Sequence, residues 1–148
     1  MKSIRLIIDD GILDIYYKDY FKKYPRRKKR TIVHAVPMSL NRFIAMKRMQ
    51  QNSVKQNYKE FSSWLASYYN IANLYLDKAT ITYIYYFKDH RRRDMDNMML
   101  TPKFFNDGFV QNRVLVDDSG DILEIKFESF HYDRLHPRIE MLIEWEGK

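Results

Sequence analysis

The chain contains no cysteine in its 148 residues. Disulfide bonds and thiolate metal sites are therefore excluded, and the composition is compatible with a reducing compartment. The sequence also lacks an apolar run near the roughly 20 residues that a membrane-spanning helix needs. Residues 1–5 lead into a short strand-like run without the pattern of a signal peptide. We therefore expect a soluble, cytoplasmic protein that does not contact a membrane.

What the chain does have is apolar content and positive charge. A hydrophobic fraction of 45% with 16% aromatic residues is typical of a folded protein, and the length suits one domain with a buried core. The formal net charge is +7. A basic domain of this kind most often binds a polyanion such as nucleic acid. A basic protein with no nucleic-acid role is the alternative at this point.

The first third of the sequence reads mainly as strands. Apolar runs at residues 4–8 and 12–17, separated by the turn signal Asp-Asp-Gly, predict an N-terminal hairpin. Residues 31–36 read as a further strand, which Pro37 ends. Residues 43–52 fit a helix or a strand.

A helical period begins at Val54. Apolar residues recur at i+3 and i+4 along one face, which Trp64 widens, and core packing is the expected role of this stripe. The stripe consists of Val54, Tyr58, Phe61, Leu65 and Tyr68. The rest of the chain predicts a strand at 79–87, a short helix from Thr101 that Gly108 interrupts or ends, a strand at 122–130, a loop at 131–137 and a strand at 139–145.

The predicted order of strands and helices gives an α+β fold, a small mixed β-sheet with helices packed on one face. We divide the chain into an N-terminal hairpin and basic arm at residues 1–30 and a main part at residues 31–148. Both are expected to belong to a single domain.

The basic arm has seven cations in residues 22–30. Such a block repels itself and should be exposed. It is either a solvated loop or an arm that contacts phosphates, where each cation releases counterions. The candidate nucleic-acid contacts in and beyond the arm are Arg26, Arg27, Lys28, Lys29, Arg30, Arg42, Lys47 and Arg48.

A second charged segment at residues 91–97 combines both signs. Arg91, Arg92 and Arg93 run directly into Asp94 and Asp96. Carboxylates hold hard divalent cations, which prefer oxygen ligands. Arginines hold phosphate, which such metals often accompany in enzymes. The segment therefore indicates a metal-dependent enzyme acting on nucleic acid, with the three arginines as further nucleic-acid contacts.

Two acidic pairs are candidates for the same metal site. If the chain stays extended after its strand, Asp94 and Asp96 point to one side. Asp117 and Asp118 lie at the head of the next strand, and pairing of the two strands would bring the pairs together. Such carboxylates can bind one or two Mg²⁺ ions, with Mn²⁺ as an alternative. Lys103, near a helix start between the pairs, could stabilise charge on the phosphate.

Each of these site assignments has a simpler structural alternative. Asp94 can pair with a neighbouring arginine, and residues 117–120 can be an ordinary turn. Both acidic pairs together with the basic run favour the metal site. The histidines show no ligand spacing, and only His90 is a weak candidate for supporting a ligand.

Residues 91–97, Arg-Arg-Arg-Asp-Met-Asp-Asn, resemble the Arg-Arg-Asp-Leu-Asp-Asn core motif of the RusA family of Holliday junction resolvases. Upstream, residues 37–42, Pro-Met-Ser-Leu-Asn-Arg, are similar to the family's Pro-Pro-Ser-x-Asn-Arg segment. The similarity covers residues 32–146 and implies a RusA-like nuclease domain at 31–148.

The order of the later residues also follows the family pattern. There a lysine, a short helix with an aspartate and an acidic pair come after the core motif, as Lys103, Asp107 and Asp117-Asp118 do here. The family lysine lies four residues after the second aspartate of the motif, where this chain has Leu100. Three extra residues before Lys103 would restore the match.

The resemblance implies a Mg²⁺-dependent endodeoxyribonuclease that resolves four-way DNA junctions by paired nicks during recombination and repair. Asp94, Asp96 and Asp118 would be metal ligands with Asp117 beside them, and Lys103 would assist at the phosphate. The family is common in phages and prophages, which implies the cytoplasm of a bacterium or of an infected host.

A junction with two-fold symmetry calls for two active sites, and one chain carries one acidic cluster, so we expect a homodimer. Phe104, Phe105 and Phe109 are the candidate interface, or else part of the core. Two other functions stay open: a metal nuclease for other branched or flap DNA, and a non-catalytic nucleic-acid-binding protein. Bare carboxylates repel phosphate, which argues against the last.

Overall fold

The fold is built around one open mixed sheet with the strand order β1-β5-β2-β3, and β4 also pairs with β2. The computed structural model describes residues 1–31 and 33–147. The strands are β1 (Lys2–Ile8), β2 (Ala79–Phe87), β3 (Leu123–Phe127), β4 (His131–Tyr132) and β5 (Arg138–Trp145). β5 is antiparallel to both β1 and β2, whereas β3 and β4 run parallel to β2.

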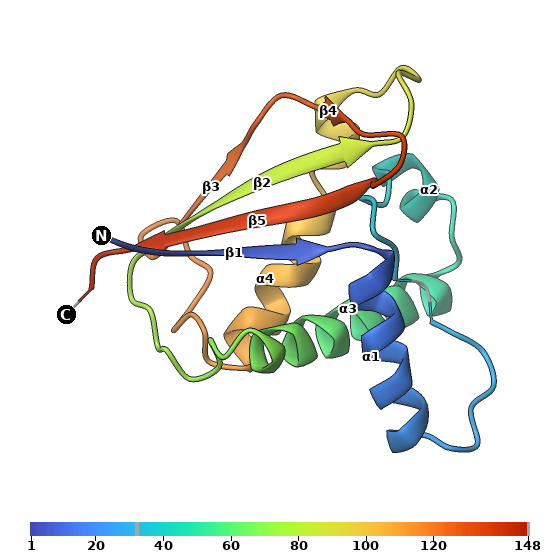
Figure 1. Ribbon diagram of the computed structural model, residues 1–148, viewed down its shortest axis with the longest axis horizontal. Coiled ribbons are helices and arrows are strands. Elements are labelled where there is room, and N and C mark those ends of the chain that lie inside the picture. The colour runs from blue at the N-terminus through green and yellow to red at the C-terminus, as the bar shows by residue number, and fades with distance from the viewer. Residues whose placement is uncertain (32, 148) are drawn as a thin grey trace.

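The longer helices lie on one side of this sheet, so the opposite face is open (Figure 1). The helical elements are α1 (Asp10–Lys23), α2 (Leu40–Ile44), α3 (Arg48–Tyr68), the short 3-10 helix η1 (Met95–Met98) and α4 (Thr101–Gln111). The predicted α+β class with a mixed sheet is confirmed. No helix in residues 1–31 and 33–147 is long and apolar enough to cross a membrane.

Alternation along β2 creates the core face of the sheet. Its odd-numbered residues from Ala79 to Phe87 are buried, as they are along β5 at Ile139, Met141 and Ile143. Successive strand residues point to opposite faces, so these two rows face the helices together. The strand predicted at 79–87 is confirmed at both ends, and the last strand begins one residue earlier than predicted.

The predicted apolar stripe of α3 is largely confirmed. Val54, Tyr58, Phe61 and Leu65 are fully buried, whereas Tyr68 at the end of the helix is partly exposed. The ambiguous segment at 43–52 contains the end of α2 and the start of α3.

Gly108 neither interrupts nor ends α4, contrary to both sequence interpretations. It lies within the helix, where a Cβ atom would come 2.3 Å from the Cβ of Ser62 on α3. No real side chain tolerates that distance, so the glycine allows the two helices to approach closely. Phe104, Phe105 and Phe109 are buried on the same helix, which confirms them as core residues and removes them as candidates for a dimer interface.

The predicted N-terminal hairpin is wrong. β1 is present, but it pairs with β5 near the other end of the chain, and residues 12–17 belong to α1. Asp9 begins this helix because its carboxylate accepts a hydrogen bond from the Ile12 N–H at 2.8 Å. The buried residues Leu13, Tyr16, Tyr17 and Tyr20 follow a helical period, a signal that the strand reading overlooked.

The predicted strand at 31–36 is also wrong for its described residues, while Ile32 lies outside the described residues. Val33 and Ala35 are buried with His34 exposed between them, so the alternation is real. However, tyrosine hydroxyls, and not a neighbouring strand, make hydrogen bonds with the backbone of this segment. That of Tyr17 donates to the Thr31 carbonyl at 2.8 Å, and that of Tyr58 accepts from the His34 N–H at 3.4 Å.

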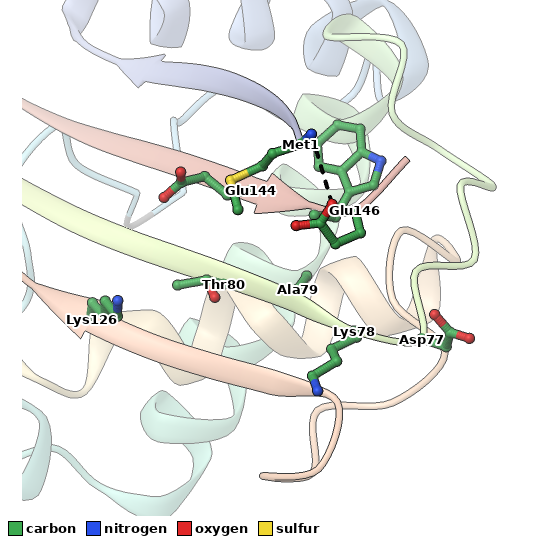
Figure 2. A pocket seen from close by; sticks show the side chains of 9 residues that line it. Met1, Asp77, Lys78, Ala79, Thr80, Lys126, Glu144 and Glu146 are labelled. Carbon is green, nitrogen blue, oxygen red and sulfur yellow. Dashed lines mark ion pairs between the residues drawn. The ribbon is translucent and has the colours of Figure 1, made fainter. Parts of the chain in front are cut away.

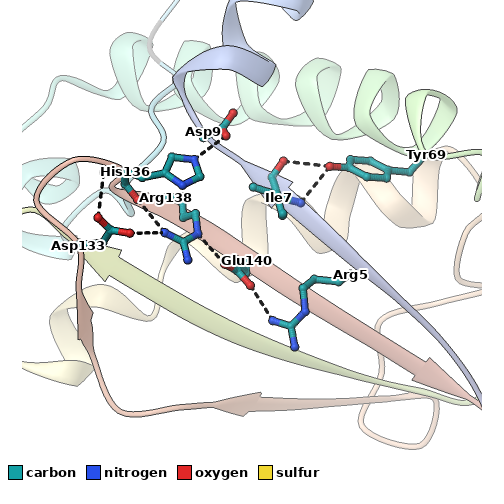
Figure 3. A network of polar contacts seen from close by, with 8 residues as sticks. All are labelled: Arg5, Ile7, Asp9, Tyr69, Asp133, His136, Arg138 and Glu140. Atoms are coloured by element: carbon teal, nitrogen blue, oxygen red, sulfur yellow. Dashed lines mark hydrogen bonds and ion pairs between the residues drawn. The ribbon is translucent and has the colours of Figure 1, made fainter.

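Edge strand β1 is held at Ile7 by one side chain. The Tyr69 hydroxyl accepts a hydrogen bond from the Ile7 N–H at 3.1 Å and donates one to the Ile7 carbonyl at 3.2 Å (Figure 3). Tyr69 follows the end of α3 directly, so this contact joins the helix layer to the edge of the sheet.

An ion-pair network centred on the buried side chain of Glu140 crosses the open face of the sheet. The Glu140 carboxylate accepts hydrogen bonds at 2.6 Å from both Arg5 on β1 and Arg138 on β5 (Figure 3). Burial opposes the ionisation of Glu140, but the two arginines outweigh it and hold its pKa below the usual 4.5. The charge on Glu140 therefore stabilises the folded state.

We expect Glu140→Gln to lower the free energy of unfolding at pH 7 by about 2 kcal/mol, because charged hydrogen bonds are lost. The folded pKa is depressed, so the stabilisation is complete above pH 4.5 and disappears as the pH falls through the folded value. The variant should thus lose less stability than the wild type on acidification. Urea unfolding of both proteins between pH 7 and pH 3 measures this, with Glu144→Gln on the same strand as the matched control. Equal stability of the two variants at pH 7 would contradict the expectation.

Candidate nucleic-acid and metal site

The acidic motif follows β2 but does not continue its extended conformation. Asp94 precedes η1 with extended backbone angles, and Asp96 lies inside that 3-10 turn. A 3-10 helix has about three residues per turn, so the side chains do not alternate as they do in a strand. The prediction that the chain stays extended from Asp94 to Asp96 is therefore wrong. Both side chains are nevertheless exposed.

The two carboxylates have only weak local partners. Arg92 Nε lies 3.8 Å from an Asp94 oxygen, a long surface contact that contributes little. An Asp96 oxygen accepts a hydrogen bond from the Asn97 N–H at 3.1 Å. Most of the lone pairs of the two carboxylates therefore face outward and can take a cation or water.

The three arginines of the motif have different roles. Arg93 is only 15% exposed, stacks over the Phe87 ring at 4.0 Å and binds Asp89 at 2.9 Å. This hydrogen bond lowers the pKa of Asp89. Arg91 and Arg92 are 75% and 93% exposed. Arg93 thus shapes the segment, and the other two can reach a ligand.

The second motif segment, at residues 37–42, meets the first in space. The Asn41 N–H donates to the Asn97 Oδ1 at 3.0 Å, across 56 positions of sequence. The Met38 N–H donates to the Thr101 hydroxyl at 3.0 Å, and Ser39 caps α2. The two segments that carry the family resemblance are therefore joined by one direct hydrogen bond, with a second from Met38 to Thr101 at the start of α4.

Exposed cations lie on both of these segments. α2 contacts η1, and the exposed cations Arg42, Lys47 and Arg48 lie on or just after α2. Together with the exposed arginines before η1, they make a surface suited to phosphates.

Lys103 and Asp118 line one hollow of about 330 Å³ along α4, with Met99 and Asn106. Asp118 also lines a shallower neighbouring hollow with Asp107. Lys103 and Asp107 on α4 therefore each share a hollow with Asp118, which follows the helix in the loop before β3.

Strand pairing does not bring the two acidic pairs together, contrary to the sequence argument. β2 and β3 are parallel, so Leu123 at the head of β3 lies opposite Ala79 at the start of β2, whereas η1 follows the far end of β2. Asp117 and Asp118 lie in an irregular segment just before a bend and turn at residues 119–122, and an Asp117 oxygen accepts a hydrogen bond from the Asp118 N–H at 2.8 Å. The hollow that Asp118 lines reaches Met99, the residue after η1, but neither Asp94 nor Asp96 lines it.

Within residues 1–31 and 33–147, no three His, Asp or Glu side chains gather as a metal-binding group. The available donors are exposed carboxylates, and Mg²⁺ binds through one or two carboxylates while keeping several waters. The donor chemistry of Asp94, Asp96 and Asp118 fits that ion.

The basic arm packs against α1, and two of its cations interact with residues there. Arg27 stacks over Tyr24 at 3.9 Å and donates to the Tyr20 hydroxyl at 2.6 Å. Arg30 binds Asp14 at 2.8 Å. The exposed cations that remain in the arm include Arg26, Lys28 and Lys29.

Two contacts near the end of β2 were not predicted from the sequence. The His90 ring stacks on Tyr132 with centroids 3.7 Å apart, although 42 positions separate them, and no sequence signal indicates that contact. The ion pair between Asp89 and Arg93 could have been predicted from the sequence, because the two residues are four positions apart.

A further hollow of about 340 Å³ lies at the other end of the sheet, near both chain termini (Figure 2). Lys78, Lys126 and Glu144 line it, and none of the predicted site residues does. Neither a protein-family model nor a curated protein matches this chain.

Proposed function

We propose that the protein is a Mg²⁺-dependent endonuclease that cuts four-way DNA junctions. The observation that carries the proposal is the hydrogen bond between Asn41 and Asn97. It joins the two motif segments beside an exposed acidic pair, and both segments carry exposed cations. This arrangement suits a phosphate beside a divalent cation better than it suits a purely binding surface.

Each group has a role in the proposed reaction. Asp94 and Asp96, with Asp118 and Asp117 as further donors, would hold the ion. When bound, Mg²⁺ polarises the phosphodiester and lowers the pKa of an attacking water.

The cations of the chain act on the DNA. Lys103 faces charge that develops on the scissile phosphate. Arg91 and Arg92 hold neighbouring phosphates, which fixes the position of the backbone without reading its sequence.

A homodimer is part of this proposal. Two coordinated nicks in a junction with two-fold symmetry require two sites related by the same symmetry. Sedimentation should therefore report a dimer at working concentration. A monomer would favour the alternative of a nuclease for flap or other branched DNA.

The direct test compares synthetic four-way junctions with linear duplexes of the same sequence, with and without Mg²⁺. Paired nicks in the junction that need the metal support the proposal. Binding without cleavage under every metal condition would favour the non-catalytic nucleic-acid-binding protein.

For the basic arm, we expect replacement of Arg26, Lys28 and Lys29 by alanine to weaken the binding of junctions and duplexes alike. Each lost phosphate contact should reduce the slope of log K against log salt by about 0.9. Titrations between low and moderate salt measure the slope. Replacement of Lys78 and Lys126, at the other end of the sheet, is the control. An unchanged slope in the arm variant would identify the arm as a solvated loop.

A further inference from the structure

The turn before β5 is rigidly built. Both oxygens of Asp133 are used: one accepts from the backbone N–H groups of Leu135 and His136 at 3.2 and 3.1 Å, and the other from Arg138 at 3.0 Å. Figure 3 shows His136 also reaching Asp9, 2.7 Å away at the start of α1. We call residues 133–138 the Leu135 turn.

This rigid turn presents an apolar side chain to solvent. Leu135 is 94% exposed, and its neighbour Arg134 is exposed as well. A single exposed leucine is ordinary on a protein surface. Here, however, the backbone on both sides is fixed by hydrogen bonds, so the side chain is held out with little conformational freedom to lose on binding.

An aromatic stack stands beside the turn. Tyr132 pairs with Phe87 at the end of β2, and the Asp133 N–H donates to the Phe87 carbonyl at 2.8 Å. The Tyr132 ring lies on His90 and is still 42% exposed. His90 directly precedes the exposed Arg91.

The same end of the sheet therefore combines an exposed leucine, an exposed aromatic ring and exposed cations. Aromatic rings stack with unpaired bases, and apolar side chains insert between base steps that are already weakened. The cations favour nucleic acid over an apolar protein partner.

We propose that this surface recognises unstacked bases at the branch point of DNA, with Leu135 inserted at the branch and a base stacked on Tyr132. The inference rests on the proposed function, because it assigns the feature of the substrate that the same enzyme would recognise. The surface distinguishes branched from linear DNA, whereas the arm binds both.

The test uses a four-way junction that carries 2-aminopurine at the branch point, together with the matching duplex, in EDTA so that no cleavage occurs. The emission of 2-aminopurine rises when the base unstacks. The wild-type protein should raise it in the junction and leave it unchanged in the duplex. Leu135→Ala should abolish the rise and weaken junction binding about tenfold, with duplex affinity retained.

Three further variants separate recognition from structure. Tyr132→Ala should weaken junction binding roughly five- to a hundredfold, and Tyr132→Phe, which keeps the ring, should bind as the wild type does. Leu74→Ala removes another exposed leucine, one that precedes β2 at the opposite end, and should leave both DNA affinities and the emission unchanged.

Several results would overturn the inference. They are a wild-type protein that binds junctions without raising the emission, a Leu135→Ala variant that keeps the rise, and an equal loss of junction and duplex binding. A variant that changes only self-association in sedimentation would identify the turn as a protein contact instead. The readout is independent of cleavage: base unstacking by a protein that never cuts DNA supports this inference and contradicts the nuclease proposal.

Discussion

Asp96→Asn is expected to abolish Mg²⁺-dependent cleavage of four-way junctions while junction binding stays intact or becomes tighter. The carboxylate supplies negative charge to the ion and also repels the phosphate, so its neutralisation affects the two measurements in opposite directions. A bound metal stabilises the transition state by several kcal/mol, and the expected loss of rate is therefore about 10³-fold or more.

Single-turnover cleavage and gel-shift binding on the same junction measure the two effects. Asp77→Asn is the matched control, because Asp77 is an exposed aspartate that precedes β2 at the opposite end from η1. Cleavage by Asp96→Asn near the wild-type rate would remove Asp96 from the metal site.

Lys103→Ala should slow cleavage by roughly 10²–10³, the size expected for the loss of one electrostatic stabiliser at the reacting phosphate. Its position in a hollow shared with Asp118 motivates the prediction. Leu100, the residue at the family's usual lysine position, is partly buried against the core and has no charge.

The Lys103 variant should dimerise as the wild type does, which sedimentation checks, and Lys78→Ala serves as the control cation at the other end of the sheet. Full activity of Lys103→Ala would show that the three-residue displacement is misassigned and that another cation assists the phosphate.

The regular elements that could be predicted are those whose own side chains define a face. α3 and β2 carry clear periods of 3.6 and 2, and both were located from the sequence. Residues 12–17 were misread because a β-branched and aromatic composition suits strands, yet Asp9 caps a helix there. The strand expected at 31–36 failed because its backbone partners are tyrosine hydroxyls contributed by α1 and α3, which no local pattern reveals.

The candidate site shows the same division. The residue types and their order along the chain were readable, and the structure groups Lys103, Asp107 and Asp118 along α4. The position of these residues relative to Asp94 could not be predicted from the sequence. It depends on the parallel direction of β3, which is set by pairing between strands that are far apart in the sequence. The sequence also did not show that Arg93 is held within the fold while its two arginine neighbours are exposed. That difference depends on the contacts of Arg93 with Phe87 and Asp89.

The contact between Tyr69 and Ile7 affects how copies of this chain can meet. An edge strand offers unpaired N–H and carbonyl groups to any incoming strand, which is a common route to aggregation. At Ile7 one phenol occupies both groups, and burial raises the pKa of Tyr69, so the hydroxyl keeps its proton at neutral pH. Pairing with an incoming strand is therefore blocked at Ile7 by neutral hydrogen bonding, which salt does not screen. A chain with a net charge of +7 keeps that protection under the ionic conditions that weaken its charge repulsion.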